Sequence, residues 1–354
     1  MRPGWRHFVV TGLLTVPLAL AACGSSSSGG GALTTLRVGY LTNLTHAPAL
    51  VGVDRGYLQQ ALGRDVTLKT RTFNAGPTAV EAIFAGALDA AYLGPNSAIN
   101  AFSKSHGEAV RIVSGATVGG AARVVRPDER IHSAADLRGK RIATPQLGDT
   151  QDVALRTWLR KAGLNTSADG GGDVLIAPTD NAVTLALFEQ KKIDGAWVPE
   201  PWASRLVDEG GGTVLVDEAS LWPEGRFATT ELVVTTSLIR DHPEIVKALV
   251  LGNQRTINWM NQNRGQARSA AGTALATLTG KTLSTRALTD AWSHLSFTVD
   301  PVIPALAKAA GDAQSIGLLG STNLHGVVDA RFLNDALRAE GVPPINDAGL
   351  AAAA

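Results

Sequence analysis

Short apolar segments alternate with amphipathic segments along most of the chain. The alternation predicts strands separated by helices, and therefore βαβ units with mostly parallel sheets. A first group of strands is predicted at residues 36–41, 66–72, 90–93 and 111–118. The pattern begins again near residue 123, with strands predicted at 123–125, 141–144, 174–176, 195–198 and 213–216, and one more at 232–236 before a mainly helical remainder. Two groups of strands predict two lobes.

The helical segments show one buried face each. Residues 48–62 are predicted as a single helix. Further along, apolar side chains at Val80, Ile83, Phe84 and Ala87 follow the spacing i, i+3, i+4, i+7, which predicts one buried stripe. Gly86 is expected to end that helix, and Pro243 is expected in the first turn of a later one.

One phrase occurs twice. Residues 88–95 read LDAAYLGP and residues 193–201 read IDGAWVPEP, with Asp89 and Asp194 in matching positions. Each copy predicts a helix that turns through the aspartate into a short buried strand and then a proline turn. Ligands of open α/β sheets bind beyond the carboxyl ends of the strands. The two copies therefore predict two turns on opposite walls of one cleft between the lobes.

The N-terminus has the layout of an export signal. Residues 1–22 place two arginines before an apolar run, which is too short and too interrupted by Pro17 for a spanning helix. The run ends in LAA before Cys23, the one cysteine of the chain, and a Ser/Gly-rich stretch follows to residue 34. This resembles a bacterial lipoprotein signal with a lipidated Cys23 and a flexible tether. We expect a protein anchored by lipid on the outer face of the cell membrane.

Charge and motifs narrow the classes of function. Removing residues 1–22 leaves 30 Lys and Arg against 31 Asp and Glu, a balance that argues against a nucleic-acid partner. The chain has no G-x-S-x-G, H-E-x-x-H or P-loop motif, no cysteine pair and no clustered metal ligands. No catalytic residue, metal or cofactor is therefore predicted.

Three helix starts rich in small polar residues are the candidate ligand-binding elements. They lie at residues 74–77 (NAGP), 94–97 (GPNS) and 148–152 (GDTQD). Free N–H groups at a helix N-terminus favour an oxyanion, and glycine lets a ligand approach the backbone. Ordinary helix capping would also account for any one of them. Three such starts drawn from both lobes predict an anion site.

Two further stretches are expected at the cleft. TNLTH at residues 42–46 follows the first strand, and WVPEPW at residues 197–202 follows a strand of the second lobe. Trp202 can form an apolar wall for an organic ligand or belong to the core. Glu200 would repel an anion unless a proton or amine intervenes, so it can instead accept an N–H from the loop or bridge the lobes.

These stretches together resemble the solute-binding proteins of ABC importers, closest to the nitrate, sulfonate, taurine and bicarbonate group. The resemblance extends over about residues 36–330 and implies two α/β lobes of the periplasmic-binding-protein type joined by two crossovers, near 119–123 and 229–233. The first lobe would comprise residues 35–121 and 231–345, the second residues 122–230, with a disordered tail at 346–354.

The resemblance also implies the site and the function. A monomer would capture a small anion or an anion-headed organic compound and deliver it to a permease. The ligand-binding residues implied are Asn43, His46, Gly76, Gly94, Asn96, Ser97, Gly120, Thr150, Gln151, Glu200, Trp202 and Thr229.

Two alternatives stay open. Some relatives of the fold bind pyrimidine or aromatic nitrogen compounds, which would suit Glu200 and Trp202 better than bare nitrate does. The other alternative is an exported enzyme with His46 and Glu200 as acid and base across the cleft. A bicarbonate ligand would call for a metal partner, and the sequence shows no acidic metal cluster.

Overall fold

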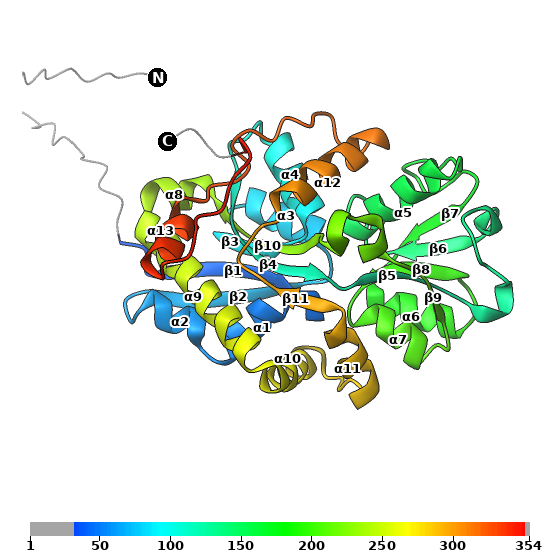
Figure 1. The fold of residues 1–354 in the computed structure, drawn as a ribbon, viewed down its shortest axis with the longest axis horizontal. Helices are drawn as coiled ribbons and strands as arrows, with labels where there is room; N and C mark the ends of the chain where they lie inside the picture. Colours follow the sequence, from blue (N-terminus) through cyan, green and yellow to red (C-terminus); the bar gives the residue numbers. More distant parts are fainter. Residues whose placement is uncertain (1–31, 351–354) are drawn as a thin grey trace, which may run out of the picture. The chain divides into compact units, whose positions relative to one another are not determined.

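The computed structural model describes residues 32–350, and these residues form two β-sheets flanked by helices (Figure 1). The leader, Cys23 and most of the Ser/Gly-rich tether lie outside the described residues. In the first sheet the strand order is β11-β4-β10-β3-β1-β2, from β1 (Thr35–Leu41), β2 (Thr67–Phe73), β3 (Ala90–Leu93), β4 (Val110–Gly119), β10 (Ala228–Thr235) and β11 (Leu295–Phe297). In the second it is β7-β6-β8-β5-β9, from β5 (Ala121–Val125), β6 (Arg141–Thr144), β7 (Leu175–Pro178), β8 (Gly195–Pro199) and β9 (Thr213–Asp217).

Most strands of each sheet run in one direction, as predicted for this two-lobed α/β fold, and a minority run the other way. Strands β1, β2 and β3 pair in parallel, as do β6, β7 and β8. The crossover strands run the other way: β10 is antiparallel to β3 and β4, and β5 to β8 and β9. The parallel strands end at the boundary between the lobes. A strand that enters a sheet from that boundary must therefore run against them.

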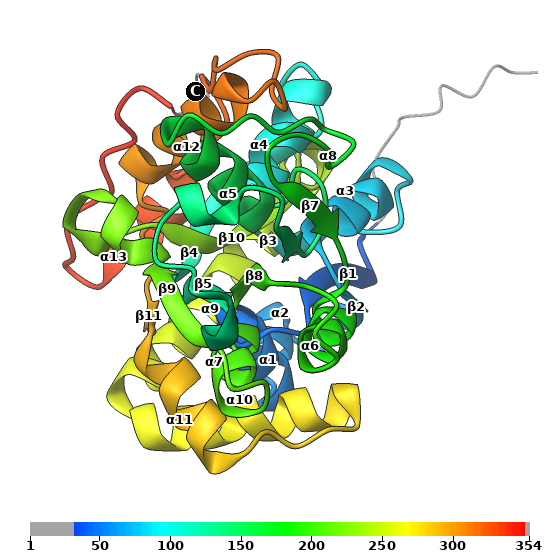
Figure 2. The ribbon, with the colours of Figure 1, turned by 90° about the vertical axis from the view of Figure 1, so that its right-hand side faces the viewer.

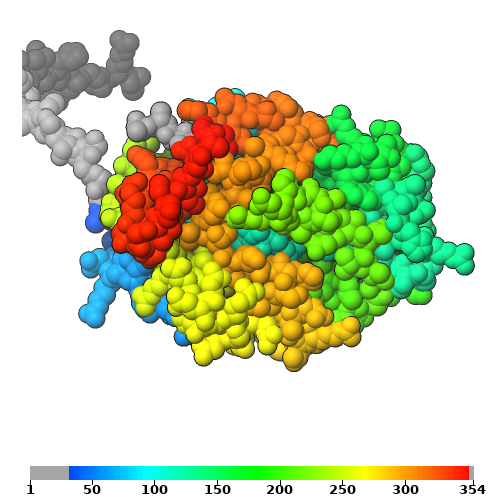
Figure 3. Space-filling view, in the orientation of Figure 1, coloured from blue at the N-terminus to red at the C-terminus, as the bar shows by residue number. Residues whose placement is uncertain are grey.

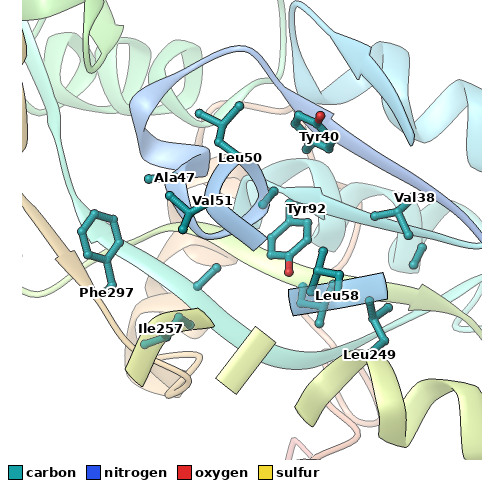
Figure 4. Close-up of a cluster of buried hydrophobic side chains, with 14 of the residues drawn as sticks. Val38, Tyr40, Ala47, Leu50, Val51, Leu58, Tyr92, Leu249, Ile257 and Phe297 are labelled. Atoms are coloured by element: carbon teal, nitrogen blue, oxygen red, sulfur yellow. The ribbon is translucent and has the colours of Figure 1, made fainter. Parts of the chain in front are cut away.

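Helices cover both faces of the first sheet. The helices of this lobe and its C-terminal extension are α1 (Ala47–Asp54), α2 (Tyr57–Leu62), α3 (Gly76–Phe84), α4 (Pro95–Lys104), α8 (Thr236–Asp241), α9 (Pro243–Gln262), α10 (Arg264–Thr279), α11 (Thr285–Ser293), α12 (Ile303–Ser315) and α13 (Arg331–Ala339). Alternate residues of β10 point to opposite faces, so Leu232 and Val234 join the core with α1 and α9 while Val233 joins the core with α3, α4 and α12. Figure 4 shows the first of these cores.

In the second lobe, helix α5 (Thr150–Lys161) covers one face of the sheet, and α6 (Asn181–Glu189) and α7 (Trp202–Asp208) cover the other (Figure 2). Arg123 of β5 is fully buried, and its guanidinium carbon lies 3.8 Å from the ring centroid of Trp158 on α5. Burial lowers the pKa of Arg123 to about 9. The aromatic face offsets part of the cost of burying this cation.

Some predicted elements differ from the structure. The helix expected over residues 48–62 is two helices, because Arg55 and Gly56 break it and Gly56 has a φ of +71°. Phe84, expected in a buried stripe, is 48% exposed because α3 ends there. The strand β11 lies in a region expected to be helical. In the expected tail, the Leu350 carbonyl accepts hydrogen bonds from the N–H groups of Gly326 and Val328.

The repeated phrase has the same structural role in each lobe. The Asp89 carboxylate accepts a hydrogen bond from the backbone N–H of Arg37 in β1 (2.8 Å), and Asp194 accepts one from Arg141 in β6 (2.7 Å). The backbone N–H groups of both aspartates donate back to the carbonyls of the same arginines (2.9 and 2.8 Å). Each aspartate therefore fixes the turn that leads into its strand against the neighbouring strand.

The aromatic residue of each copy belongs to a core. Tyr92 points into the first core, where its hydroxyl bonds to Asn253 Oδ1 (3.0 Å; Figure 4). Trp197 is fully buried and its Nε1 donates to Glu218 Oε2 (2.8 Å). These aromatic rings pack the lobes rather than line the space between them.

The C-terminal helices connect the lobes away from the strand ends. Ser284, just before α11, donates its hydroxyl hydrogen to Asp208 Oδ2 of α7 (2.7 Å), and Lys161 of α5 pairs with Asp312 of α12 (3.4 Å). In Figure 3 the golden atoms of the α11 region meet the green atoms of the second lobe. These contacts hold the two lobes together.

Replacing either repeated aspartate with alanine should destabilise the fold. Each substitution removes an acceptor from a strand N–H, so we expect Asp194→Ala to lower the free energy of unfolding by about 1 kcal/mol. Asp89→Ala should cost about 1–2 kcal/mol, because it also removes the ion pair with the half-exposed Arg37. Urea unfolding measures both. Asp65→Ala, at an exposed position before β2, is the control, and an equal effect there would contradict this role for the repeat.

Candidate functional site

A small cavity of about 20 Å³ lies where the carboxyl ends of the parallel strands of the two sheets meet. The structure brings half of the predicted residues together here: Asn43, His46, Gly94, Thr150, Gln151 and Thr229. Leu41, Thr45, Pro145, Asp149 and Pro199 complete the lining. The first lobe contributes residues from β1, β3 and β10 or from the turns that follow, and the second lobe contributes the ends of β6 and β8 and the start of α5. The space holds about one water molecule.

The N-termini of α4 and α5 line this cavity, and the N-terminus of α3 lies beside Ser97 and Asp149 next to it. Helix α3 begins at Gly76, α4 follows Gly94, and α5 begins at Thr150. A Cβ atom added to Gly76 would lie 2.2 Å from Ser97 Oγ, and one added to Gly94 would lie 2.6 Å from Thr150 Oγ1. Both distances are too short for any side chain, so glycine is required for the helix starts to approach each other. The convergence joins elements of both lobes.

Two hydroxyl groups at these starts are buried without a hydrogen-bond partner. Ser97 is 2% exposed and Thr150 is 4% exposed. Among the described residues, neither Ser97 Oγ nor Thr150 Oγ1 has a partner in hydrogen-bonding geometry. Buried hydroxyl groups are usually bonded, because an unpaired one costs about 1–3 kcal/mol. Their position favours a polar group of a ligand as the missing partner.

Asp149 lines the cavity but is not among the residues predicted from the sequence. Its carboxylate is 5% exposed, and Oδ1 accepts a hydrogen bond from the Thr150 N–H (2.8 Å). Burial raises the pKa of Asp149 to about 6, while the Thr150 N–H and, more weakly, the Gly76 N–H and the Ser97 hydroxyl lower the pKa. The sequence marks Asp149 as a residue before a helix, typical of an N-cap. Nothing in the sequence indicates that this carboxylate faces two helix starts of the other lobe.

His46 lies at the cavity as a neutral imidazole. It is 2% exposed, and its Nδ1 accepts a long hydrogen bond from the Leu41 N–H (3.4 Å). Burial lowers the pKa of His46 to about 3. A group that binds a proton so weakly is a poor general acid or base near neutral pH.

Glu200 faces its own helix rather than the cavity. Its carboxylate accepts hydrogen bonds from the N–H and the hydroxyl of Ser204 in α7 (3.1 and 3.0 Å). Its backbone bridges the lobes, because the carbonyl accepts from Leu44 N–H (3.0 Å) and the N–H donates to the Gly120 carbonyl (2.8 Å). The alternative of an acid–base pair of His46 and Glu200 is therefore not supported by this geometry. The carboxylate accepts an N–H as one expected role requires, although from α7, and the bridge between the lobes is made by the backbone of Glu200.

The other predicted residues have structural partners. Gly120 is the single residue between β4 and β5, at the first crossover. Thr229 donates to the Gly119 carbonyl (2.7 Å) and steadies the second crossover. Asn96 turns away from the cavity and donates to the Ala309 carbonyl of α12 (3.3 Å). Asn96 is thus a packing residue here, because its position on α4 points to α12.

A larger cavity of about 330 Å³ adjoins the small one. Asn43 lines both cavities, and its Oδ1 accepts a hydrogen bond from Trp202 Nε1 (2.8 Å). The larger cavity also has apolar side chains from α6 and α10, including Leu185 and Leu275. Arg205 stacks over the Trp202 ring at 4.7 Å from its centroid. Trp202 therefore forms a wall of this space, as one of its two predicted roles requires.

Comparisons with known proteins place the chain in a family. Residues 29–275 match the NMT1-like family. The chain belongs to that family. A relative from Brucella abortus (strain 2308), named as a binding protein, is 30% identical over 216 residues, which are 61% of this chain and 63% of the relative. The chain thus spans less than two thirds of the length of the curated relatives it matches first.

Solved structures share the fold of this NMT1-like protein. The alkanesulfonate-binding protein SsuA of Xanthomonas axonopodis pv. citri, bound to MOPS, matches with a TM-score of 0.68 and 20% identity over 82% of this chain and 96% of its own. The nitrate-binding protein NrtA of Synechocystis PCC 6803 matches with a TM-score of 0.70 and 15% identity, over 88% of this chain and 90% of its own. At these identities the match shows the two-sheet fold.

The described part of this NMT1-like chain shows no group of three His, Cys, Asp or Glu side chains placed to hold a metal ion. No helix within residues 32–350 has both the length and the apolar character needed to cross a bilayer.

The buried Glu200 carboxyl should make the fold less stable as the pH rises. Burial raises the pKa of Glu200 to about 7, so the folded state binds this proton more tightly than the unfolded state does. Below the ordinary pKa near 4.5, Glu200 makes its full contribution of about 3 kcal/mol to the free energy of unfolding. This contribution is lost as the pH rises through 7. We expect Glu200→Gln to reduce the loss of unfolding free energy between pH 5 and pH 8, measured by urea unfolding.

Glu209 supplies the control for this measurement. Its pKa is lowered by the hydrogen bonds from Arg205, so it stays ionised throughout that pH range. Glu209→Gln should leave the difference between pH 5 and pH 8 unchanged. An undiminished pH dependence in Glu200→Gln would show that Glu200 is not the group responsible.

Proposed function

We propose that this protein is the substrate-binding component of an ABC importer and captures an anion-headed organic compound between its two lobes. The two-sheet fold, membership of the NMT1-like family and the binding-protein names of its relatives support this proposal. Opening and closing of two lobes around a ligand is a common way for such folds to report occupancy. The permease would recognise the closed form.

The observation that carries the proposal is the convergence of three helix starts on one buried point. The first N–H groups of α3, α4 and α5 have no partner within their own helices. The macrodipoles of the three helices add a positive potential at that point without any lysine or arginine. Thr150 adds a hydroxyl whose oxygen is unpartnered, and Ser97 adds one that faces the Asp149 carboxylate without a hydrogen bond in good geometry. This arrangement suits an oxyanion such as a sulfonate.

The adjoining cavity favours an organic ligand over a bare inorganic anion. Its volume of about 330 Å³ lies in the range of small-molecule sites. Trp202 offers a flat apolar face, and Asn43 between the two cavities offers an amide. A ligand with its anionic group at the helix starts and its organic part beside Trp202 would fill both spaces.

A second candidate is a ring compound with N–H groups, and Asp149 is the observation that favours it. A carboxylate at the cavity can accept hydrogen bonds from such a ligand. Under this alternative the helix starts would only cap their helices. The two candidates differ in the ligand and share the transport role.

The cellular setting is part of the proposal. The export signal and Cys23 support a lipid-anchored monomer on the outer face of the cell membrane, tethered by its Ser/Gly-rich segment and beside a permease. The near balance of acidic and basic residues supports a small-molecule ligand rather than nucleic acid.

Removing either unpartnered hydroxyl should weaken binding of an alkanesulfonate. We expect Ser97→Ala and Thr150→Ala each to cost about 1–2 kcal/mol of binding free energy, the scale of one hydrogen bond to a charged group. A thermal-shift screen with alkanesulfonates, taurine, nitrate, bicarbonate and pyrimidines identifies the ligand, and calorimetry then measures the affinity. Ser103→Ala, near the far end of α4, is the control.

The result also separates the two candidates. If both substitutions leave the affinity for a stabilising sulfonate unchanged, the helix starts do not bind the anion. If only ring compounds with N–H groups stabilise the protein, the second candidate replaces the first.

A further inference from the structure

The Asp149 carboxylate lies where the proposed function places the anionic group of the ligand. Its Oδ1 is 3.4 Å from the position of a Cβ atom on Gly76 and 3.7 Å from that on Gly94. It belongs to the second lobe, whereas both glycines start helices of the first lobe. The N–H of Gly76 and the hydroxyl of Ser97 both act on this carboxyl and lower its pKa. A side chain of one lobe thus reaches the helix starts of the other.

The helix starts therefore already face an oxyanion in this structure. Donors directed at a carboxylate would serve the oxygen atoms of a ligand equally well. The remaining cavity of about 20 Å³ is too small for a sulfonate beside Asp149. The ligand and the aspartate cannot use these donors together.

Building on the proposed function, we propose that the Asp149 carboxylate and the anionic group of the ligand compete for one set of donors at the starts of α3, α4 and α5. Asp149 then takes the place of the ligand anion at these donors. Its contacts with the helix starts of the first lobe, which we call the clasp, hold the two lobes together until an anion displaces the carboxylate. The competition sets a threshold of binding free energy. An anion binds between the lobes only if its contacts with the donors are more favourable than those of Asp149, or if it makes further contacts beside Trp202. Asp149 is in this sense a specificity-determining residue.

The charged groups around Asp149 set the direction of its pH dependence. On its own helix the Asp152 carboxylate raises the pKa of Asp149 and is itself paired with Arg156 (2.9 Å). Of the described residues lining the cavity, His46 is the other with a titratable side chain, and it is neutral near pH 7. Acidification therefore protonates Asp149 before His46, and it favours the ligand-free state, in which burial has raised the pKa of Asp149.

The affinity for an alkanesulfonate should then fall as the pH falls, because Asp149 must give up this proton when an anion displaces its carboxyl into water. A sulfonate stays ionised throughout, so Asp149 is the group that changes. With a pKa of about 6 at the cavity and an ordinary pKa near 4 in water, the association constant should fall about tenfold between pH 8 and pH 5.

The test is calorimetry with propane-1-sulfonate on the full chain at pH 5, 6, 7 and 8. We expect Asp149→Asn to bind about tenfold more tightly than the natural protein at pH 8 and to lose the pH dependence. Asp312→Asn, which removes another contact between the lobes far from the cavity, should keep both the affinity and the pH dependence. A weaker or unchanged affinity in Asp149→Asn would overturn the competition, and a complete loss of binding would make Asp149 a direct ligand contact.

A measurement without any ligand tests the clasp separately from the proposed function. Hydrogen–deuterium exchange at residues 94–99, the start of α4, should become at least severalfold faster in Asp149→Asn and in Asp149→Ala, and stay slow in Asp312→Asn. Two substitutions of Asp149 are used so that the result does not depend on one variant, and a melting curve of each would reveal a folding defect. If exchange stays slow in both, Asp149 does not hold the lobes together, and the inference fails. If exchange rises while no alkanesulfonate or nitrate binds, the ligand class of the proposed function fails and the clasp stands.

Discussion

The unpaired N–H groups at the starts of α3, α4 and α5 are the constraint on which the site depends. Each helix follows a strand that ends at the boundary between the lobes, so each directs its unsatisfied donors at the same small space. Glycines at positions 76 and 94 let the helix starts approach more closely than any side chain would allow. Buried donors need acceptors, and the two acceptors that fit are a carboxylate of the chain and an anionic ligand.

This constraint explains why the cavity between the lobes contains the Asp149 carboxyl group and is still suited to an anion. Asp149 approaches the donors from the second lobe, and burial makes its charged form costly. Glu200 keeps its carboxylate away from the cavity and contributes its backbone to the junction. The cavity therefore combines a positive potential from helix ends with a carboxyl group that the same potential holds in place.

The two lobes repeat one local solution. Asp89 and Asp194 each fix a turn against a neighbouring strand by the same pair of backbone contacts, and Tyr92 and Trp197 each fill a core. The crossover strands β5 and β10 differ from this pattern because they enter their sheets from the boundary between the lobes. Gly120 and Thr229 lie at the junction, where the Gly120 carbonyl accepts from the Glu200 N–H and the Thr229 hydroxyl links β10 to β4.

The sequence by itself determined the alternation of strands and helices, the two-lobed α/β fold and the polar helix starts near the cavity, and it left open whether Trp202 forms a wall or belongs to the core. These features depend on local periodicity, glycine and proline placement and short motifs, which act over a few residues. Only the tertiary structure decided that Asp149 faces the other lobe, that Glu200 turns to Ser204 and that Asn96 turns to α12. The partner of Asn96 lies 213 residues away and Asp149 faces helix starts of the other lobe, so neither contact leaves a local pattern. Ser204 is only four residues from Glu200, but the packing around α7 decides which way that carboxylate turns.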